Sequence, residues 1–250
     1  MDSAIVIPAR YASSRLPAKP LLKSTGKYLI QHVYERCCRS KRARFVIVAT
    51  DDTRIAAAVE SFGGNIVMTR SDHRSGSDRV AEVAADLEVD VIINVQGDEP
   101  EVDPAGLDQL PEMLEQNDDA EIATLAVPIT SSVQWRDPNC VKVVCDRRGR
   151  ALYFSRSPIP YVREGEPDFA ARPARFLQHL GIYAYRRDFL LRLARLAQEP
   201  IEEMEKLEQL RVLAHGQGIW VEVIAQAQTG VDTLDQYEAF VQRFRLARAA

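Results

Sequence analysis

Apolar and polar positions alternate along the first hundred residues in blocks that predict strands and helices in turn. Continuous apolar runs are typical of strands buried on both faces of a sheet. They lie at residues 5–7 and 45–49, and further strands are predicted at residues 65–69 and 90–95. Apolar residues at helical spacing fall between these runs, at residues 27–39, around Ile55 to Phe62 and around Val80 to Leu87. This rhythm indicates βαβ units and a largely parallel sheet.

The second half of the chain follows a different pattern. Apolar runs predict further strands at residues 122–128, 141–145, 151–154, 176–185 and 219–224. Gly149 suits a hairpin turn between the second and third of these strands. Helical spacing predicts helices at residues 107–115, 189–196 and 201–214, and from Leu234 onward. We therefore expect one α/β domain over residues 1–250, with a hairpin and a proline-rich excursion at residues 140–175.

The loop after the first strand carries the clearest candidate chemistry. Cations, prolines and small residues share this segment: Arg10, Arg15, Lys19, Pro8, Pro17, Pro20, Ala9, Ala12, Ser13, Ser14 and Ala18. A strand in a parallel sheet delivers the following loop to the carboxyl edge, where open α/β folds bind ligands. Small side chains let backbone N–H groups approach phosphate oxygens, and the cations neutralise phosphate charge. A solvated basic loop would carry the same charge, but the stiffening prolines favour a polyanion-binding loop.

Two carboxylates are predicted to reach the same edge of the sheet. The fourth strand is followed by Gln96, Gly97, Asp98 and Glu99, and Asp232 follows the last strand. Because parallel strands point the same way, Asp98 should lie near the basic loop. A carboxylate beside bound phosphates needs a cation between them, and magnesium takes a few carboxylates, waters and substrate oxygens. We expect Asp98 and Asp232 to be the metal pair, although Asp98 could be a turn former and Asp232 a helix N-cap.

Composition narrows the classes of function. A formal net charge of −4 argues against a nucleic-acid binder that works by broad phosphate neutralisation. No apolar run approaches the ~20 residues that span a bilayer, and no secretory signal is recognisable, so we expect a cytoplasmic protein without a membrane partner. The cysteines lack C-x-x-C spacing and are expected to be free thiols, with no zinc site: Cys37, Cys38, Cys140 and Cys145. The absence of G-x-G-x-x-G discounts a nicotinamide or flavin enzyme.

Eight segments follow one another along the chain: IPARYASSRLPAKPL, VATDD, MTRSDHRSGSDR, NVQGDEP, ALYFSR, HLGIY, LEQLRVL and GVDT. Together, over residues 5–234, they resemble the 3-deoxy-manno-octulosonate (Kdo) cytidylyltransferase family of nucleotidyltransferases. The resemblance implies a Rossmann-like nucleotide-diphospho-sugar transferase fold with a mixed, mainly parallel sheet and a small hairpin subdomain. It implies that CTP and Kdo give CMP-Kdo and pyrophosphate for lipopolysaccharide biosynthesis. The alternatives are a cytidylyltransferase for 8-amino-Kdo or sialic acid, and a non-catalytic nucleotide sensor.

The resemblance also implies roles for residues in these segments. The residues that it implies for catalysis and triphosphate binding are Ala9, Arg10, Lys19, Asp98 and Asp232, and the two aspartates would bind Mg2+. The residues that it implies for cytosine binding are Arg74, Ser75 and Arg79. The residues that it implies for binding the sugar acid are Arg15, Gln96, Arg156, His179, Tyr183, Glu208 and Gln209. By spacing alone, Tyr183 could be a core aromatic, His179 a buried strand histidine, and Glu208 with Gln209 a solvated helix face.

Two positions depart from the family's pattern. The family commonly has glycine where this chain has Ala18, and proline where it has Tyr28. If residue 18 takes a positive φ, alanine strains the loop, so either the loop bends elsewhere or it binds phosphate less well. The family also pairs as homodimers, and the hairpin at residues 141–154 with the excursion after it is the expected contact.

Overall fold

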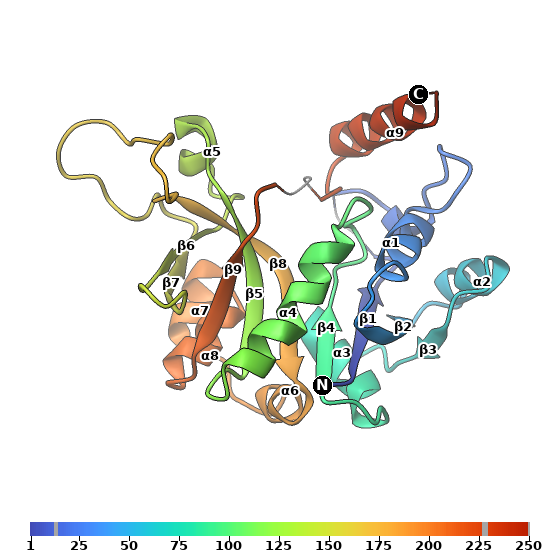
Figure 1. Ribbon diagram of the computed structural model, residues 1–250. Helices are drawn as coiled ribbons and strands as arrows, with labels where there is room; N and C mark the ends of the chain where they lie inside the picture. Colours follow the sequence, from blue (N-terminus) through green and yellow to red (C-terminus); the bar gives the residue numbers. More distant parts are fainter. Residues whose placement is uncertain (13–14, 227–229, 250) are drawn as a thin grey trace. The chain divides into compact units, whose positions relative to one another are not determined.

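The computed structural model describes residues 1–12, 15–226 and 230–249, and the chain forms two compact units (Figure 1). The first unit comprises Met1–Asp108 and Gln228–Ala250, and the second comprises Gln109–Ala227. Ser13 and Ser14 of the basic loop lie outside the described residues. The single domain expected over residues 1–250 stays a prediction.

The first unit is built on a parallel sheet with the strand order β3-β2-β1-β4. The strands are β1 (Ser3–Ala9), β2 (Ala43–Thr50), β3 (Ile66–Met68) and β4 (Val91–Asn94). Ile5 pairs with Val46 on one side and with Ile93 on the other. Every residue of β1 is buried, which explains its uninterrupted apolar run. The predicted alternation of parallel strands and helices is confirmed.

Within the described residues, four α-helices belong wholly to the first unit. They are α1 (Leu29–Cys37), α2 (Thr53–Ser61), α3 (Gly76–Ala85) and α9 (Leu234–Ala249). The first three pack on strands of the parallel sheet, with α1 and α3 against β1 and β2 and α2 against β2 and β3. Within the described ranges, no helix is both long and apolar enough to cross a membrane.

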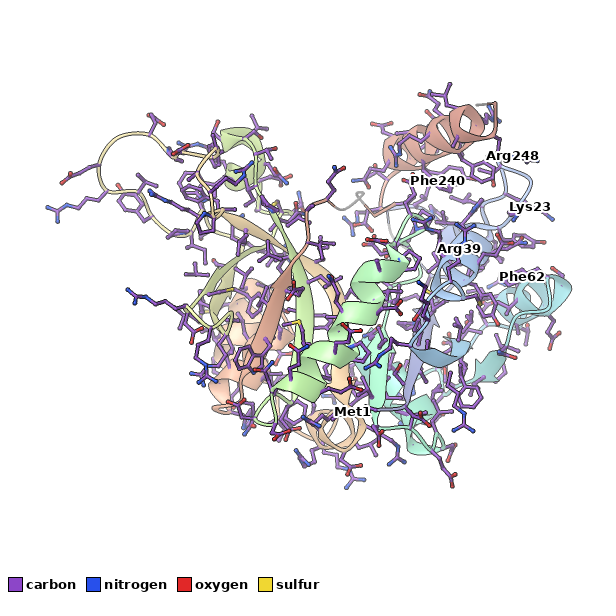
Figure 2. The ribbon with its side chains drawn as sticks, in the orientation of Figure 1. Met1, Lys23, Arg39, Phe62, Phe240 and Arg248 are labelled. Carbon is purple, nitrogen blue, oxygen red and sulfur yellow. The ribbon has the colours of Figure 1, made fainter. Side chains whose placement is uncertain are left out.

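Helix α9 packs against α1 and the basic loop. Their shared apolar cluster consists of Leu16, Leu29, Val231, Tyr237, Phe240 and Val241. Phe240, labelled on α9 in Figure 2, also meets the ring of His32 edge-on at a centroid distance of 5.0 Å. The hydroxyl of Tyr237 accepts the backbone N–H of Ser24 at 2.7 Å. These contacts hold the start of α9 beside the loop that carries the predicted cations.

The second unit contains a mixed sheet centred on β5. Its strands are β5 (Ile122–Pro128), β6 (Lys142–Cys145), β7 (Ala151–Ser155), β8 (Leu177–Arg186) and β9 (Ile219–Val223). Strand β5 runs antiparallel to β8 and parallel to β9, while β6 runs antiparallel to both β7 and β8. Gly149, at a φ of 85°, lies in the turn of the predicted β6–β7 hairpin. The α/β class with a mixed, mainly parallel sheet is confirmed.

The helices of the second unit correct one prediction. They are α5 (Ser132–Arg136), α6 (Arg187–Leu193), α7 (Pro200–Glu205) and α8 (Gln209–Ala214), while α4 (Pro104–Gln116) spans the division between the units along the chain. The single helix expected over residues 201–214 is wrong, because Lys206 takes the left-handed conformation at a φ of 52° and ends α7. Lysine is a good helix former, so local propensity does not reveal this break.

Candidate active site

A pocket of about 320 Å³ opens where the chain leaves β1 and β4. Among the described residues its lining is Pro8, Ala9, Arg10, Ala12, Arg15, Lys19, Pro20, Gln96, Gly97, Asp98 and Asp232. All of them belong to the first unit. The structure thus brings the predicted cations of the loop and both predicted carboxylates to one edge of the parallel sheet.

Two glycines allow the segments of this edge to approach one another. A Cβ on Gly97 would lie 3.1 Å from the carbonyl oxygen of Pro8, so a larger residue would push the β4 segment away from the loop. A Cβ on Gly76, the first residue of α3, would lie 3.4 Å from the side chain of Pro8 and 3.7 Å from Oε1 of Gln96. The N-terminus of α3, where helix dipoles are positive, therefore lies beside pocket residues.

Lys19 lies at the centre of the charged cluster. Its Nζ is 2.6 Å from Oδ2 of Asp98 and 3.0 Å from Oδ1 of Asp232. The Lys19 side chain is only 13% exposed. Arg15 reaches the other oxygen of Asp232, with Nη2 3.0 Å from Oδ2. Two carboxylates therefore converge on one small cationic group.

The alternative in which Asp232 is the N-cap of α9 is wrong. The hydroxyl of Thr233 accepts the N–H of Gln236 at 3.3 Å, and Oε1 of Gln236 accepts the N–H groups of Asp232 and Thr233. Thr233 and Gln236 thus cap the helix reciprocally, and the Asp232 carboxylate faces Lys19. The N–H of Val231 donates to the carbonyl of Asp98 at 2.8 Å, which ties together the two turns that carry the carboxylates.

Glu99 places a third acid near this pair. Burial, followed by the charges of Asp98 and Asp232, raises the pKa of Glu99 to about 8, and the charge of Lys19 offsets this only in part. The Glu99 carboxyl group packs on Gly230, where a Cβ would lie 2.7 Å from Oε1. A third negative charge beside Asp98 and Asp232 is therefore unfavourable at this corner of the unit.

Ala18 has a positive φ, the conformation that the family's usual glycine would adopt without strain. Its φ of 53° and ψ of 27° are left-handed, and it directly precedes the short 3-10 helix η1 (Lys19–Leu21). Of the two alternatives, the one in which the loop bends elsewhere is wrong, and weaker phosphate binding stays a prediction. An L-residue pays about 1–2 kcal/mol for this conformation, so the turn that directs Lys19 into the pocket is strained.

The three residues predicted to bind cytosine are not among the described residues that line this pocket. The hydroxyl of Ser75 accepts an N–H at 3.1 Å within α3 and caps that helix. Arg79 is buried, donates to Thr69 and lies 3.2 Å from Asp51. Arg74 is exposed, at the edge of the same helix. Ser75 and Arg79 thus support the local fold, and a contact of all three with cytosine stays a prediction.

Gln96, predicted for the sugar, lines the pocket and leads to a residue that the sequence analysis missed. Its Nε2 donates to Oδ1 of Asn94 at 3.3 Å. Asn94 is completely buried at the end of β4, and its Nδ2 has no hydrogen-bond partner among the described residues. An unpaired buried donor is unfavourable. The signal in the sequence was a single polar residue at the end of an apolar strand.

His179 and Tyr183 lie together on β8 in the second unit, with ring centroids 5.3 Å apart. The hydroxyl of Thr124 donates to the carbonyl of Ile182 at 2.7 Å, so it accepts a hydrogen bond from Nε2 of His179 at 3.0 Å. Burial lowers the pKa of His179 to about 3 and raises the pKa of Tyr183 well above its usual range. Both rings are therefore neutral polar groups, which suit hydroxyl partners.

Glu208 and Gln209 lie at the start of α8. The charge of Glu208 is close enough to contribute to the raised pKa of Tyr183, after burial and the neighbouring Tyr185. Gln209 is 6% exposed, and its Nε2 has no hydrogen-bond partner among the described residues. The alternative of a solvated helix face is therefore wrong for Gln209. A ligand oxygen would satisfy this buried donor.

The side chain of Arg156 is hydrogen-bonded within the second unit. Its guanidinium donates to three backbone carbonyls, those of Glu205 at 2.7 Å, Pro138 at 2.9 Å and Lys206 at 3.4 Å. These bonds hold the turn between α7 and α8, in which Lys206 takes its left-handed conformation. The predicted contact of Arg156 with a sugar carboxylate stays a prediction, because only part of the guanidinium's donor capacity is left for it.

A basic loop and a carboxylate pair at the carboxyl edge of an α/β sheet define a nucleotidyltransferase site. The chain belongs to the cytidylyltransferase family, whose model matches residues 4–219. This family is the one that the eight sequence segments indicated.

Relatives narrow the group within that family. The chain is 50% identical, over 93% of its length and 94% of the relative, to the 3-deoxy-manno-octulosonate cytidylyltransferase of Syntrophotalea carbinolica. It is 51% identical to the enzyme of the same name from Syntrophobacter fumaroxidans, over 94% of each chain. It is also similar to the solved structure of a CMP:2-keto-3-deoxy-manno-octonic acid synthetase complexed with CTP, with a TM-score of 0.92, 45% identity, and 99% and 100% of the two chains covered. The expected resemblance to 3-deoxy-manno-octulosonate cytidylyltransferases is confirmed.

Proposed function

We propose that the protein transfers CMP from CTP to the anomeric hydroxyl of Kdo, giving CMP-Kdo and pyrophosphate. The names of the relatives support both substrates. The observation that carries the proposal is the contact of Lys19 with both Asp98 and Asp232 in a pocket that Arg10 and Arg15 also line. Such an edge combines cations for a triphosphate with acids for a divalent ion.

Positioning and charge stabilisation are the main tasks of the protein in this reaction. Arg10, Arg15 and Lys19 bind the triphosphate, and Lys19 exchanges its carboxylate contacts for phosphate oxygens as CTP enters. In the second unit, neutral His179 and Tyr183 and the unpaired amide of Gln209 bind hydroxyl groups of the sugar. The acceptor's hydroxyl then attacks the α-phosphorus in line with the departing pyrophosphate.

We also propose that Asp98 and Asp232 hold Mg2+. Their oxygens are ligands of the kind that magnesium prefers, and both carboxylates converge on the single Nζ of Lys19, a position that a cation can take. Within the described ranges, no group of three or more His, Cys, Asp or Glu side chains could hold a metal ion alone. Water and substrate oxygens would complete the coordination. The bound ion would neutralise charge on the phosphates and lower the pKa of the attacking hydroxyl.

Pyrophosphate release tests the function directly. The purified protein is incubated with CTP, Kdo and MgCl2, and we expect turnover that requires all three and stops on addition of EDTA. Parallel reactions replace CTP with UTP, or Kdo with 8-amino-Kdo or N-acetylneuraminate. Faster turnover with another sugar acid would change the assigned substrate, and CTP binding without turnover would favour a nucleotide sensor.

We further propose that the protein is a homodimer that pairs through the β6–β7 hairpin and supplies CMP-Kdo for lipopolysaccharide biosynthesis. Leu152 on β7 is 58% exposed, and such an interface would cover it. Light scattering after size exclusion should give the mass of a dimer. The variant Leu152→Asp should shift that mass toward the monomer, and an unchanged mass would place the interface elsewhere.

A further inference from the structure

Lys142 on β6 is a completely buried lysine for which the proposed reaction has no use. Its Nζ donates to three backbone carbonyls, those of Asp137 at 2.9 Å, Cys140 at 2.6 Å and Arg156 at 2.6 Å. Three carbonyl acceptors require three N–H donors, which only the ammonium form provides. Lys142 is therefore a positive charge inside the second unit, even though burial lowers its pKa.

No carboxylate forms an ion pair with this ammonium in the part of the chain that the structure describes. Backbone dipoles contact it directly, and the charges of Asp137 and Glu205 act on it only at longer range. Burying a charge without an ion-pair partner is unfavourable. The position therefore calls for an explanation beyond packing.

Lys142 and Arg156 hold the same segments. Lys142 binds the turn at residues 137–140 and the carbonyl of Arg156, while Arg156 binds that same turn through Pro138 and the end of α7 through Glu205. The Glu205 carboxylate closes the network by accepting the N–H of Arg156 at 2.9 Å. The two cations thus join the end of β7 to the turn that precedes Glu208 and Gln209.

We propose that Lys142 is a positioning residue for the acidic sugar. It holds the backbone of Arg156, and through it the turn before α8, and its charge lies close enough to interact with that of Arg156. A sugar that carries a carboxylate gains from both effects, whereas CTP binds in the pocket of the first unit. This inference rests on the proposed function.

Steady-state kinetics of Lys142→Gln and Lys142→Met test the proposal. Glutamine keeps N–H donors for two of the carbonyls but removes the charge, and methionine removes both. We expect the KM for Kdo to rise about tenfold in Lys142→Gln and further in Lys142→Met, with the KM for CTP and kcat within about twofold of wild type. The matched control is Arg147→Gln, which removes an exposed positive charge from the turn of the same hairpin; it should leave both KM values unchanged.

A double-variant cycle with Arg156→Gln separates positioning from a general loss of stability. If Lys142 acts through Arg156, Lys142→Gln/Arg156→Gln should bind Kdo no more than about twofold worse than Arg156→Gln alone. Additive losses, or equal rises in the KM for CTP and Kdo, would overturn the proposal.

Two further outcomes are decisive. If circular dichroism shows that neither Lys142 variant folds, Lys142 serves only stability and the proposal is wrong. If the wild-type protein releases no pyrophosphate from CTP and Kdo, the proposed function itself fails. An active wild-type protein with unchanged Kdo binding in the variants overturns only the role of Lys142.

Discussion

The two units hold their central lysines in opposite ways. Lys19 of the first unit lies at the end of a loop, retains 13% exposure and contacts two carboxylates. Lys142 of the second unit lies on a strand, is completely buried and contacts three backbone carbonyls. Carboxylates can exchange one cation for another, whereas these carbonyls belong to the fold. The proposed nucleotide region therefore carries exchangeable charge, and the proposed sugar region carries fixed charge.

The largest effect should come from removing the charge of one of the two carboxylates that contact Lys19. Asp98→Asn keeps the shape of the side chain but removes a proposed metal ligand, so we expect kcat to fall about 10²–10³-fold. Circular dichroism and the melting temperature should stay close to wild type, because the Asp98 side chain is partly exposed. Asp86→Asn, an exposed aspartate at the end of α3, is the matched control. A near-normal kcat in Asp98→Asn would exclude the magnesium assignment.

The second largest effect concerns Lys19, which contacts both carboxylates. Lys19→Met should raise the KM for CTP about 10–100-fold, because a charge-assisted hydrogen bond contributes about 1.5–3 kcal/mol, and it should change the KM for Kdo much less. Without nucleotide, the same variant should bind Mn2+ more tightly than wild type, because Nζ no longer lies between the two carboxylates.

Electron paramagnetic resonance of Mn2+ measures this second effect. Lys23→Met, in which an exposed lysine of the same segment is replaced, should leave Mn2+ binding unchanged, and so should Lys142→Gln. Weaker Mn2+ binding in Lys19→Met would show that Lys19 supports the site instead of competing with the ion, and the contrast between the two lysines would be lost.

A smaller effect is expected from the neutral histidine of the second unit. His179 has a pKa of about 3 in the folded protein against 6.5 in the unfolded chain. As the pH falls below 6.5 the unfolded chain binds a proton that the folded protein does not, so the free energy of unfolding decreases. Between pH 7 and 5.5 this loss should be about 1 kcal/mol. Urea unfolding of His179→Gln should lack this part of the loss; an identical pH dependence in both proteins would mean that His179 is protonated when folded.

The smallest effect compares the two strained turns. Ala18 and Lys206 are the non-glycine residues with a positive φ in the described part of the chain. Ala18 directly precedes Lys19, and the carbonyl of Lys206 is bound by Arg156, which Lys142 holds. Ala18→Gly and Lys206→Gly should each raise the free energy of unfolding by roughly 0.5–1 kcal/mol, because glycine adopts this conformation without steric cost. The control is Ala12→Gly, at a residue without a positive φ, which should not raise the free energy of unfolding. A loss of stability in either variant would show that the turn is held by contacts that need the side chain.

Periodicity predicted most elements because burial acts directly on the pattern of residues. The strand over residues 122–128 was placed at its observed bounds, Ile122–Pro128. The prediction of one helix over residues 201–214 was wrong, since the left-handed Lys206 ends α7. Arg156, about fifty residues away along the chain, donates hydrogen bonds to the carbonyls of this turn. Long-range hydrogen bonds to backbone carbonyls leave no trace in local propensity.

The amino-acid sequence by itself determined the parallel βαβ order, the basic loop and the edge at which Asp98 and Asp232 meet it, because strand direction and loop chemistry are local properties. Tertiary structure alone decided that Lys19 bridges the two carboxylates, that Thr233 rather than Asp232 caps α9, and that Lys142 is a buried charge. Each of these depends on which distant group lies within about 3 Å, and only the packing of the whole unit sets that distance.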